Sequence, residues 1–196
     1  SFRQLIQIYH KICETIAYSH TVGVIHRDLK PENVMIGRFG EVLVVDWGIA
    51  KVLGTKGKAF DGVETNRSRG DSRTTRMGML AGTPAYMSPE QAEGRVDLID
   101  THSDIYTLGA ILYKILSGKQ PYAGNSALEI VEKVKSKHPI SLLITSSGQQ
   151  RIERSDVDSI EGENAGKIPL PLIEICEKAM AREISERFHS ASELAS

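Results

Sequence analysis

The chain has 196 residues and a formal net charge of −1 at pH 7, because 24 Lys and Arg nearly balance 25 Asp and Glu. That length allows roughly 70% of the unfolded surface to be buried, enough for one hydrophobic core. The balanced charge argues against nucleic-acid binding, for which a strongly basic domain is typical. Neither a signal peptide nor an apolar run of 18 residues occurs, so we expect a cytoplasmic segment without membrane contact. A transmembrane segment elsewhere in the parent protein remains compatible with this.

In chain order, helical spacing of apolar residues predicts a helix over residues 5–20, which Gly23 can close. Two β-branched runs follow at 34–36 and 41–45. The Gly-bounded turn 37–40 between them predicts a β-hairpin. The hairpin would bring polar residues just before its first strand and just after its second to the same edge.

Residues 105–116 are apolar almost all round, which predicts a helix buried on every side and ended by Gly118. A last amphipathic helix is expected over 172–180. Residues 51–76 hold seven Lys or Arg against three Asp or Glu and lack periodicity, which predicts a long loop. Residues 136–167 are polar, and we expect most of this segment to be a surface insertion, with docking of a partner as the alternative.

The two cysteines, Cys13 and Cys176, stand alone on predicted helices, without Cys-x-x-Cys spacing or a nearby group of His residues. We expect free, buried thiols, as in a reducing cytosol. Five of the six histidines likewise lack metal-ligand spacing, and we expect them at the surface or as capping groups. These are His10, His20, His102, His138 and His189.

Three ordered motifs carry the functional signal. Residues 26–33 are His-Arg-Asp-Leu-Lys-Pro-Glu-Asn, residues 46–48 are Asp-Trp-Gly, and residues 88–90 are Ser-Pro-Glu. One three-residue match is ordinary turn chemistry, but three in this order and spacing are specific. From residue 5 onward the chain resembles the serine/threonine protein kinases, particularly the bacterial members of the eukaryotic-like family.

The resemblance implies a mainly α fold with a small β-hairpin, that of the carboxy-terminal lobe of a protein kinase (α+β). It divides the single domain 1–196 into a catalytic loop 26–33, an activation segment 46–90 and an insertion at about 136–167. No Gly-x-Gly-x-x-Gly loop and no Val-Ala-Ile-Lys strand precede residue 26. We therefore expect that the amino-terminal lobe is absent and that the natural start lies upstream.

The resemblance assigns the catalytic roles residue by residue. Asp28 would be the general base, with a turn or capping Asp as the alternative, and Lys30 would contact the transferred phosphate of ATP, as in Ser/Thr-specific relatives. Asn33 and Asp46 would supply oxygen ligands to Mg²⁺ once nucleotide is bound. Thr83 would link the activation segment to Asp28 and Lys30, unless it is a plain turn residue.

Further positions match supporting roles in the family. Met35 would lie under the adenine ring of ATP, although a Met in a strand is often only a core residue. Asp104 would anchor the backbone of the catalytic loop, or serve only as a first-turn Asp favoured by the helix dipole. Glu90 and Arg187 would form a structural ion pair.

Arg27 precedes the catalytic Asp, and relatives with this Arg are commonly switched by phosphorylation of the activation loop. Lys51 would be the second partner of the phosphate. The candidate acceptors are Ser72, Thr74 and Thr75, unless these hydroxyls are plain loop composition.

The chain also departs from the family pattern at three positions. Trp47 replaces the usual Phe, which leaves the packing between lobes in doubt. Ser88 replaces the usual Ala, which we expect to be a small change. Ile184 replaces a frequent Pro, so we expect a less rigid loop before Arg187.

These assignments predict an ATP- and Mg²⁺-dependent serine/threonine protein kinase whose partner is a protein or peptide substrate. We expect the chain alone to be inactive and to self-associate through an exposed apolar lobe interface that includes Met35 and Trp47. The alternative is a non-catalytic partner-binding module derived from a kinase lobe. A degenerate kinase would normally lack Asp28 or Asp46, and an unrelated nucleotide phosphotransferase would not need Thr83, Glu90 or Arg187.

Overall fold

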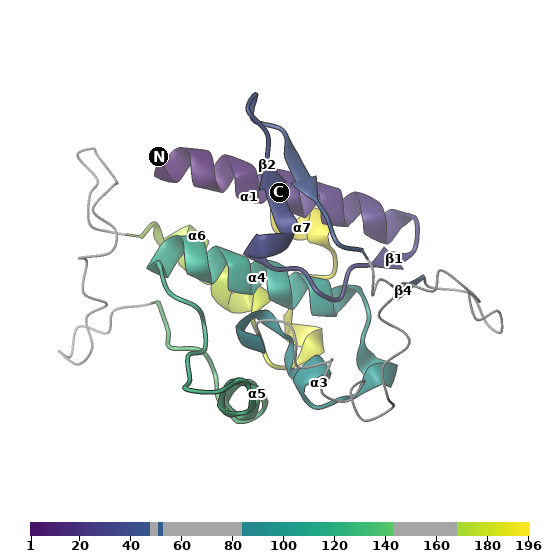
Figure 1. Cartoon of the computed structure of the whole chain (residues 1–196), viewed down its shortest axis with the longest axis vertical. Helices are drawn as coiled ribbons and strands as arrows, with labels where there is room; N and C mark the ends of the chain where they lie inside the picture. Colours follow the sequence, from purple (N-terminus) through teal and green to yellow (C-terminus); the bar gives the residue numbers. More distant parts are fainter. Residues whose placement is uncertain (48–50, 53–83, 143–167) are drawn as a thin grey trace.

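The computed structural model describes residues 1–47, 51–52, 84–142 and 168–196. Within these ranges the chain is mainly helical (Figure 1). The longer helices are α1 (Phe2–Thr21), α4 (Thr101–Ser117), α5 (Ala127–Ser136) and α6 (Leu170–Ala179). The short ones are α3 (Pro89–Ala92) and α7 (Ala191–Ala195), with 3₁₀ turns at Pro31–Asn33, Pro84–Tyr86, Val96–Leu98 and Ile184–Glu186.

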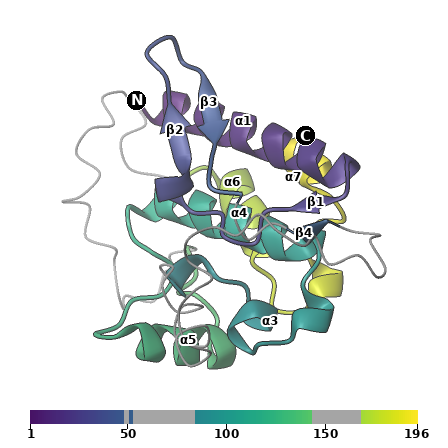
Figure 2. The ribbon, with the colours of Figure 1, turned by 45° about the vertical axis from the view of Figure 1, so that its right-hand side comes forward.

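Helix α4 is the centre of the fold. Figures 1 and 2 show α1 packed along one side of it and α3 and α5 on the opposite side, while α6 and α7 contact it as well. The Asp100 carboxylate caps its amino terminus by accepting from the amide of His102, and Gly118 ends it with a φ of 72°, in the left-handed region that favours glycine. Because α4 is buried on almost every side, it gives the other helices a common core.

Close contact between α4 and α6 depends on a glycine. A Cβ atom on Gly109 would lie 2.7 Å from Cγ of Met180 and 2.8 Å from Cβ of Ala179. The missing side chain lets the helices approach closely enough for the Cys176 thiol to donate to the carbonyl of Gly109 at 3.4 Å. Helix α6 is thereby held against the centre of the fold.

Two small antiparallel sheets complete the described part. Strands β2 (Val34–Ile36) and β3 (Val42–Val44) form the predicted hairpin, with Met35 opposite Leu43. Strand β1 (Val24–Ile25) pairs with β4 (Lys51–Val52). The expectation of a helix-rich fold with a small hairpin is confirmed. The β1–β4 pair was not predicted, because strands of two residues are too short to show an alternating sequence pattern.

Several expected boundaries were wrong, and some elements were missed. Helix α1 begins before residue 5, at Phe2, where Ser1 caps it, and the helix predicted at 105–116 begins at Thr101. The helix predicted at 172–180 is not the last, because α7 follows it. Helix α5 was missed although Ser126 and Glu129 make a recognisable amino-terminal cap. Leu142, within the segment expected to be mostly surface, is buried in the core, and residues 143–167 of that segment lie outside the described residues.

Both cysteines are free and buried, as predicted. Burial raises the pKa of the Cys13 thiol to about 12, although hydrogen bonding to Tyr9 opposes the shift. Burial likewise raises the pKa of Cys176 to about 12. Both side chains are therefore protonated core residues at neutral pH. Across the described ranges, no helix combines the length and the apolar character that crossing a membrane requires.

Candidate active site

The catalytic loop is attached to α4 through its backbone. Asp104, only 1% exposed in the first turn of α4, accepts the amide of His26 at 2.8 Å through Oδ2 and the amide of Arg27 at 2.9 Å through Oδ1. Arg27 has a φ of 71°, a conformation that costs a non-glycine residue about 1–3 kcal/mol. Such a conformation persists only where its surroundings enforce it, and the two bonds from Asp104 do so.

His20 supports Asp104 from α1. Its Nε2 lies 2.9 Å from Oδ2 of Asp104, and the side chain is only 10% exposed. The expectation of a surface or capping role for His20 was wrong. No sequence spacing identifies this contact, because 84 residues separate the partners.

His26 joins the catalytic loop to the end of the hairpin. Its Nδ1 accepts from the amide of Asp28 at 3.3 Å, so Nε2 is the atom that donates to the carbonyl of Val45 at 3.2 Å. The imidazole therefore uses both ring nitrogens to join the loop to the hairpin. The ring also packs on Trp47, with centroids 4.5 Å apart.

Three side chains of the catalytic loop converge. Nζ of Lys30 lies 2.9 Å from Oδ2 of Asp28, and Nδ2 of Asn33 donates to the carbonyl of Asp28 at 2.7 Å. Because that bond uses the amide nitrogen of buried Asn33, the oxygen of the same group is the atom suited to a metal ion. The loop thus places a carboxylate, an ammonium group and an amide oxygen together.

Asp46 lies at the same end of the hairpin as Asn33. The amide of Val45 donates to the carbonyl of Asn33 at 2.9 Å, which continues the pairing of β2 and β3 up to the residue before Asp46. Asp46 is exposed and has a φ of 64°. The described residues contain no cluster of three or more His, Cys, Asp or Glu that could hold a metal by itself. One carboxylate and one amide oxygen instead suit Mg²⁺, which takes its other ligands from phosphate and water.

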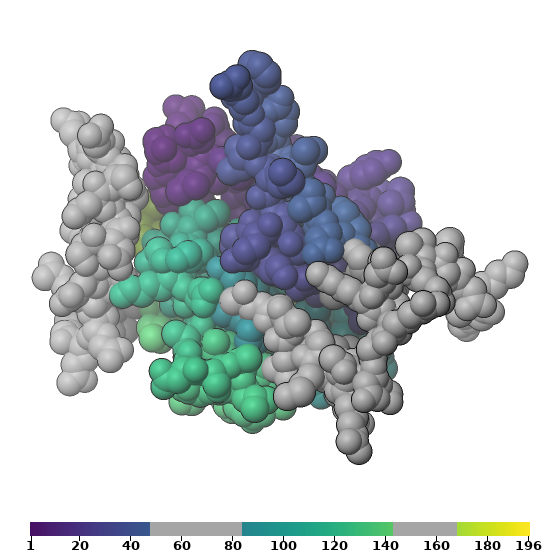
Figure 3. Space-filling model, viewed as in Figure 1, coloured from purple at the N-terminus to yellow at the C-terminus, as the bar shows by residue number. Residues whose placement is uncertain are grey.

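The hairpin carries the apolar residues beside the site. Met35 and Leu43, opposite each other, are each 57% exposed, and Figure 3 shows the hairpin projecting from the body of the molecule. Trp47, predicted to share this exposed surface, is instead half-buried against the core, and its Nε1 donates to the carbonyl of Val44 at 3.0 Å. Neither of two shallow surface depressions in the described part, one along α1 and one beside Glu90, is lined by the catalytic loop.

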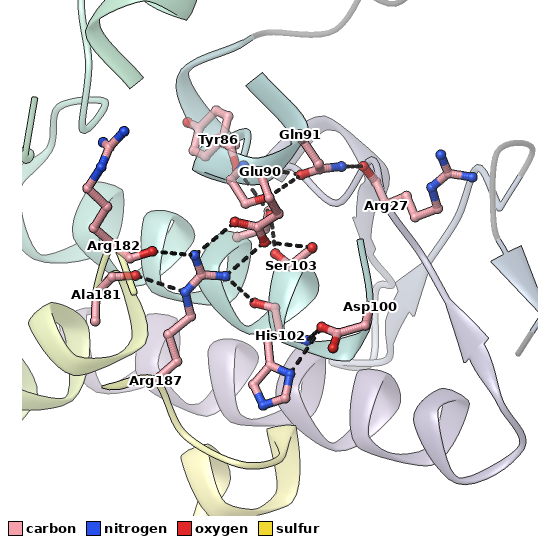
Figure 4. A network of polar contacts seen from close by, with 12 residues as sticks. Arg27, Tyr86, Glu90, Gln91, Asp100, His102, Ser103, Ala181, Arg182 and Arg187 are labelled. Carbon is pink, nitrogen blue, oxygen red and sulfur yellow. Dashed lines mark hydrogen bonds and ion pairs between the residues drawn. The ribbon is translucent and has the colours of Figure 1, made fainter. Parts of the chain in front are cut away.

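Glu90 and Arg187, predicted as partners, form a two-bond ion pair (Figure 4). Both nitrogen–oxygen distances are 2.9 Å, and both side chains are buried. Arg187 also donates to the carbonyls of Ala181, Arg182 and His102, while the Ser103 hydroxyl donates to Glu90. Burial alone raises the pKa of Glu90, but the hydrogen bonds and charge of Arg187 outweigh burial and leave the pKa below its ordinary value.

The structure places two of the departures from the family pattern, and it corrects the expectation for one of them, Ser88. Ser88, expected to be a small change, is completely buried, and its hydroxyl and amide both donate to the side chain of Gln91. Ile184 begins a turn of 3₁₀ helix, Ile184–Glu186, directly before Arg187, and the lower rigidity expected there stays a prediction. Gln91 itself was missed by the sequence analysis.

Several predicted positions lie outside the described residues, namely Ser72, Thr74, Thr75 and Thr83. For Lys51 only the backbone is described, in β4, opposite Ile25. The roles assigned to these residues remain predictions.

The sequence is similar to known proteins over nearly its whole length. A family model described as the protein kinase domain matches residues 1–195. The chain is 34% identical over 199 residues to the serine/threonine-protein kinase PknD of Protochlamydia amoebophila, covering 99% of this chain and 18% of that protein. It is 32% identical over 192 residues to PknB of Mycobacterium leprae, covering 98% of this chain and 25% of that protein. The chain thus spans a quarter or less of the length of these relatives.

Replacing Arg187 with Met should lower the free energy of unfolding by about 3–5 kcal/mol at neutral pH, because Glu90 would remain buried without its countercharge. Urea denaturation measures the change. Lys135→Met, which removes the exposed partner of Glu132, is the matched control and should change stability little, because solvent screens that pair.

The difference in stability between wild type and Arg187→Met should also depend on pH. The lowered pKa of Glu90 means that its contribution is present above the ordinary carboxyl pKa of about 4.3 and disappears as the pH falls through the lowered folded-state value. In Arg187→Met, burial would instead raise that pKa. The deficit of the variant should therefore shrink on acidification, and a deficit that stays constant from pH 7 to pH 4 would contradict the assignment.

Proposed function

The chain belongs to the protein kinase domain family, and from this premise we propose that its parent protein transfers the γ-phosphoryl group of ATP to Ser and Thr hydroxyls of protein substrates. The observation that carries the proposal is the convergence of Asp28, Lys30 and Asn33 on one loop, with Asp46 at the adjoining end of the hairpin. Phosphoryl transfer needs positioned groups and neutralised charge more than covalent help, and these four side chains supply both.

In this proposal Asp28 acts directly on the substrate. Its carboxylate accepts a hydrogen bond from the Ser or Thr hydroxyl, orients the oxygen toward the phosphoryl group and takes up its proton. Lys30, 2.9 Å from Oδ2 of Asp28, contributes a positive charge for the transferred phosphate. Thr83 would connect the activation segment to both residues.

Asn33 and Asp46 are the residues that would hold Mg²⁺. The ion, when bound with ATP, neutralises charge on the phosphate oxygens. Met35, exposed on β2, is the side chain that would lie under the adenine ring. The bonds of Asn33 to the carbonyl of Asp28 and of Val45 to the carbonyl of Asn33 tie both ligands to the base.

A second role, binding a partner or a second copy, is favoured by the exposed apolar side chains of the hairpin. These are Met35, Ile36, Phe39 and Leu43, each more than half exposed. Binding another molecule over these side chains would remove apolar surface from water, which is favourable. This role is compatible with catalysis and also describes a non-catalytic module.

Asp28→Asn in the parent protein should lower the turnover number by about 10²- to 10⁴-fold, because the amide cannot accept the hydroxyl proton. Transfer of labelled phosphate to a generic basic protein measures this. Asp46→Asn should instead mainly weaken binding of Mg²⁺–ATP. Asp97→Asn, at an exposed position in the turn Val96–Leu98, is the matched control and should leave turnover unchanged. Turnover of Asp28→Asn close to that of Asp97→Asn would refute the role of Asp28.

Active parent protein should carry phosphate within residues 72–75. A phosphate there adds about −1.5 to −2 charge, which Arg27 and Lys51 can pair with. Mass spectrometry locates the modified residues, and the triple change of Ser72, Thr74 and Thr75 to Ala should lower activity. Occupied sites found only elsewhere, together with full activity of the triple variant, would exclude this switch.

The 196 residues alone should be catalytically silent and bind Mg²⁺–ATP weakly, because they contain no Gly-x-Gly-x-x-Gly sequence to enclose the phosphates. If the dissociation constant equals or exceeds a millimolar ligand concentration, binding stabilises the fold by at most about 0.4 kcal/mol. The melting temperature should then rise by no more than about 2 °C in a thermal-shift titration. A rise of many degrees that saturates at micromolar ATP would mean that this segment holds a complete nucleotide site.

A further inference from the structure

Gln91 connects the end of the activation segment to the catalytic loop. It lies in α3, directly after Glu90, and its Nε2 donates to the carbonyl of Arg27 at 2.6 Å (Figure 4). The two residues are 64 positions apart in the sequence. The bond reaches the carbonyl of the peptide whose nitrogen belongs to Asp28.

Ser88 fixes the orientation of the Gln91 amide. Both the backbone amide of Ser88, at 3.1 Å, and its hydroxyl, at 3.0 Å, face Oε1 of Gln91. Since the backbone amide can only donate, the atom that it faces must be the oxygen Oε1, and the donating nitrogen of Gln91 must face Arg27. The Ser88 hydroxyl adds a second bond to Oε1, which an Ala at this position would lack.

Arg27 is consequently held on both sides. Asp104 of α4 accepts its amide, and Gln91 of α3 donates to its carbonyl. The residue between them has the positive φ of 71°, so two helices enforce an unfavourable backbone conformation immediately before Asp28. Helix α3 is itself held in place by the ion pair of its residue Glu90 with Arg187.

We propose that Gln91 is a positioning residue that couples the placement of α3, and with it the end of the activation segment, to the backbone orientation of Asp28. This inference rests on the proposed kinase function. We call the two bonds that hold Arg27, one to Asp104 and one from Gln91, the clamp. When α3 is in place, the Gln91 bond completes the clamp, and when α3 is displaced, the carbonyl of Arg27 loses its donor. Ser88 acts with Gln91 by holding its amide in the productive orientation.

The decisive variant is Gln91→Glu in the full-length parent protein. A carboxylate retains the oxygen that accepts from Ser88 but replaces the donor facing Arg27 with a second oxygen, so the bonds from Ser88 survive and the bond to Arg27 is lost. Gln91→Met removes both interactions at similar size. Ser126→Ala is the control, because it removes a helix-capping side chain from α5, which packs against α3, and leaves both bonds of Gln91 intact.

Gln91→Glu should lower kcat by about 10- to 100-fold, as expected when a reacting group is misplaced by about 1 Å, while KM for Mg²⁺–ATP stays within about twofold. Backbone hydrogen exchange of the segment 26–29 should quicken on the order of tenfold, since local opening no longer breaks the Gln91 bond. Gln91→Met should share both effects. Ser126→Ala should show neither, whatever its melting temperature.

The outcomes separate this inference from the proposed function. If wild-type parent transfers phosphate but Gln91→Glu keeps kcat within twofold, the coupling is refuted and the kinase function stands. If exchange of 26–29 in Gln91→Glu matches that in Ser126→Ala, the clamp itself is refuted. If the wild type transfers no phosphate while exchange quickens only in the Gln91 variants, the proposed function fails and the clamp remains.

Discussion

The conformation of the catalytic loop depends on one buried carboxylate. Asp104 accepts two backbone amides, those of His26 and Arg27, and also contacts Nε2 of His20. A buried carboxylate is costly unless hydrogen bonds satisfy it, and an amide pair in a strained turn is equally in need of acceptors. The carboxylate and the two amides therefore stabilise one another, and the loop keeps its conformation because α4, which carries Asp104, is fixed in the core.

The first turn of α4 holds three functional elements at consecutive positions. The carbonyl of His102 accepts from Arg187, the hydroxyl of Ser103 donates to Glu90, and the carboxylate of Asp104 binds the catalytic loop. Because one rigid helix end carries all three attachments, a shift of α4 would move the loop and the ion pair together. This arrangement keeps the relative placement of α3 and Asp28 within narrow limits.

The sequence predicted those features that local patterns or contiguous motifs encode. Periodicity located α1, α4 and α6 to within a few residues, and the turn 37–40 located the hairpin. Contacts between polar residues far apart have no local pattern. They were predicted only where the family resemblance supplied the pair, as for Glu90 with Arg187, and missed where it did not, as for His20 with Asp104. Gln91 was also missed. Its partner is a backbone carbonyl, which every residue has, so the sequence does not indicate which carbonyl it binds.

Two strained residues flank the proposed chemistry, Arg27 before the base and Asp46 after the hairpin, both with positive φ. Each conformation costs about 1–3 kcal/mol, which the surrounding contacts must offset. For Arg27 the offset comes from side chains of α3 and α4, so the free energy that maintains the loop comes from the packed helices. Groups held in advance need no reorganisation when a substrate arrives, which is the condition under which positioning accelerates phosphoryl transfer. The strain at Arg27 is thus best explained as the cost of presenting Asp28 from a backbone already fixed by the core.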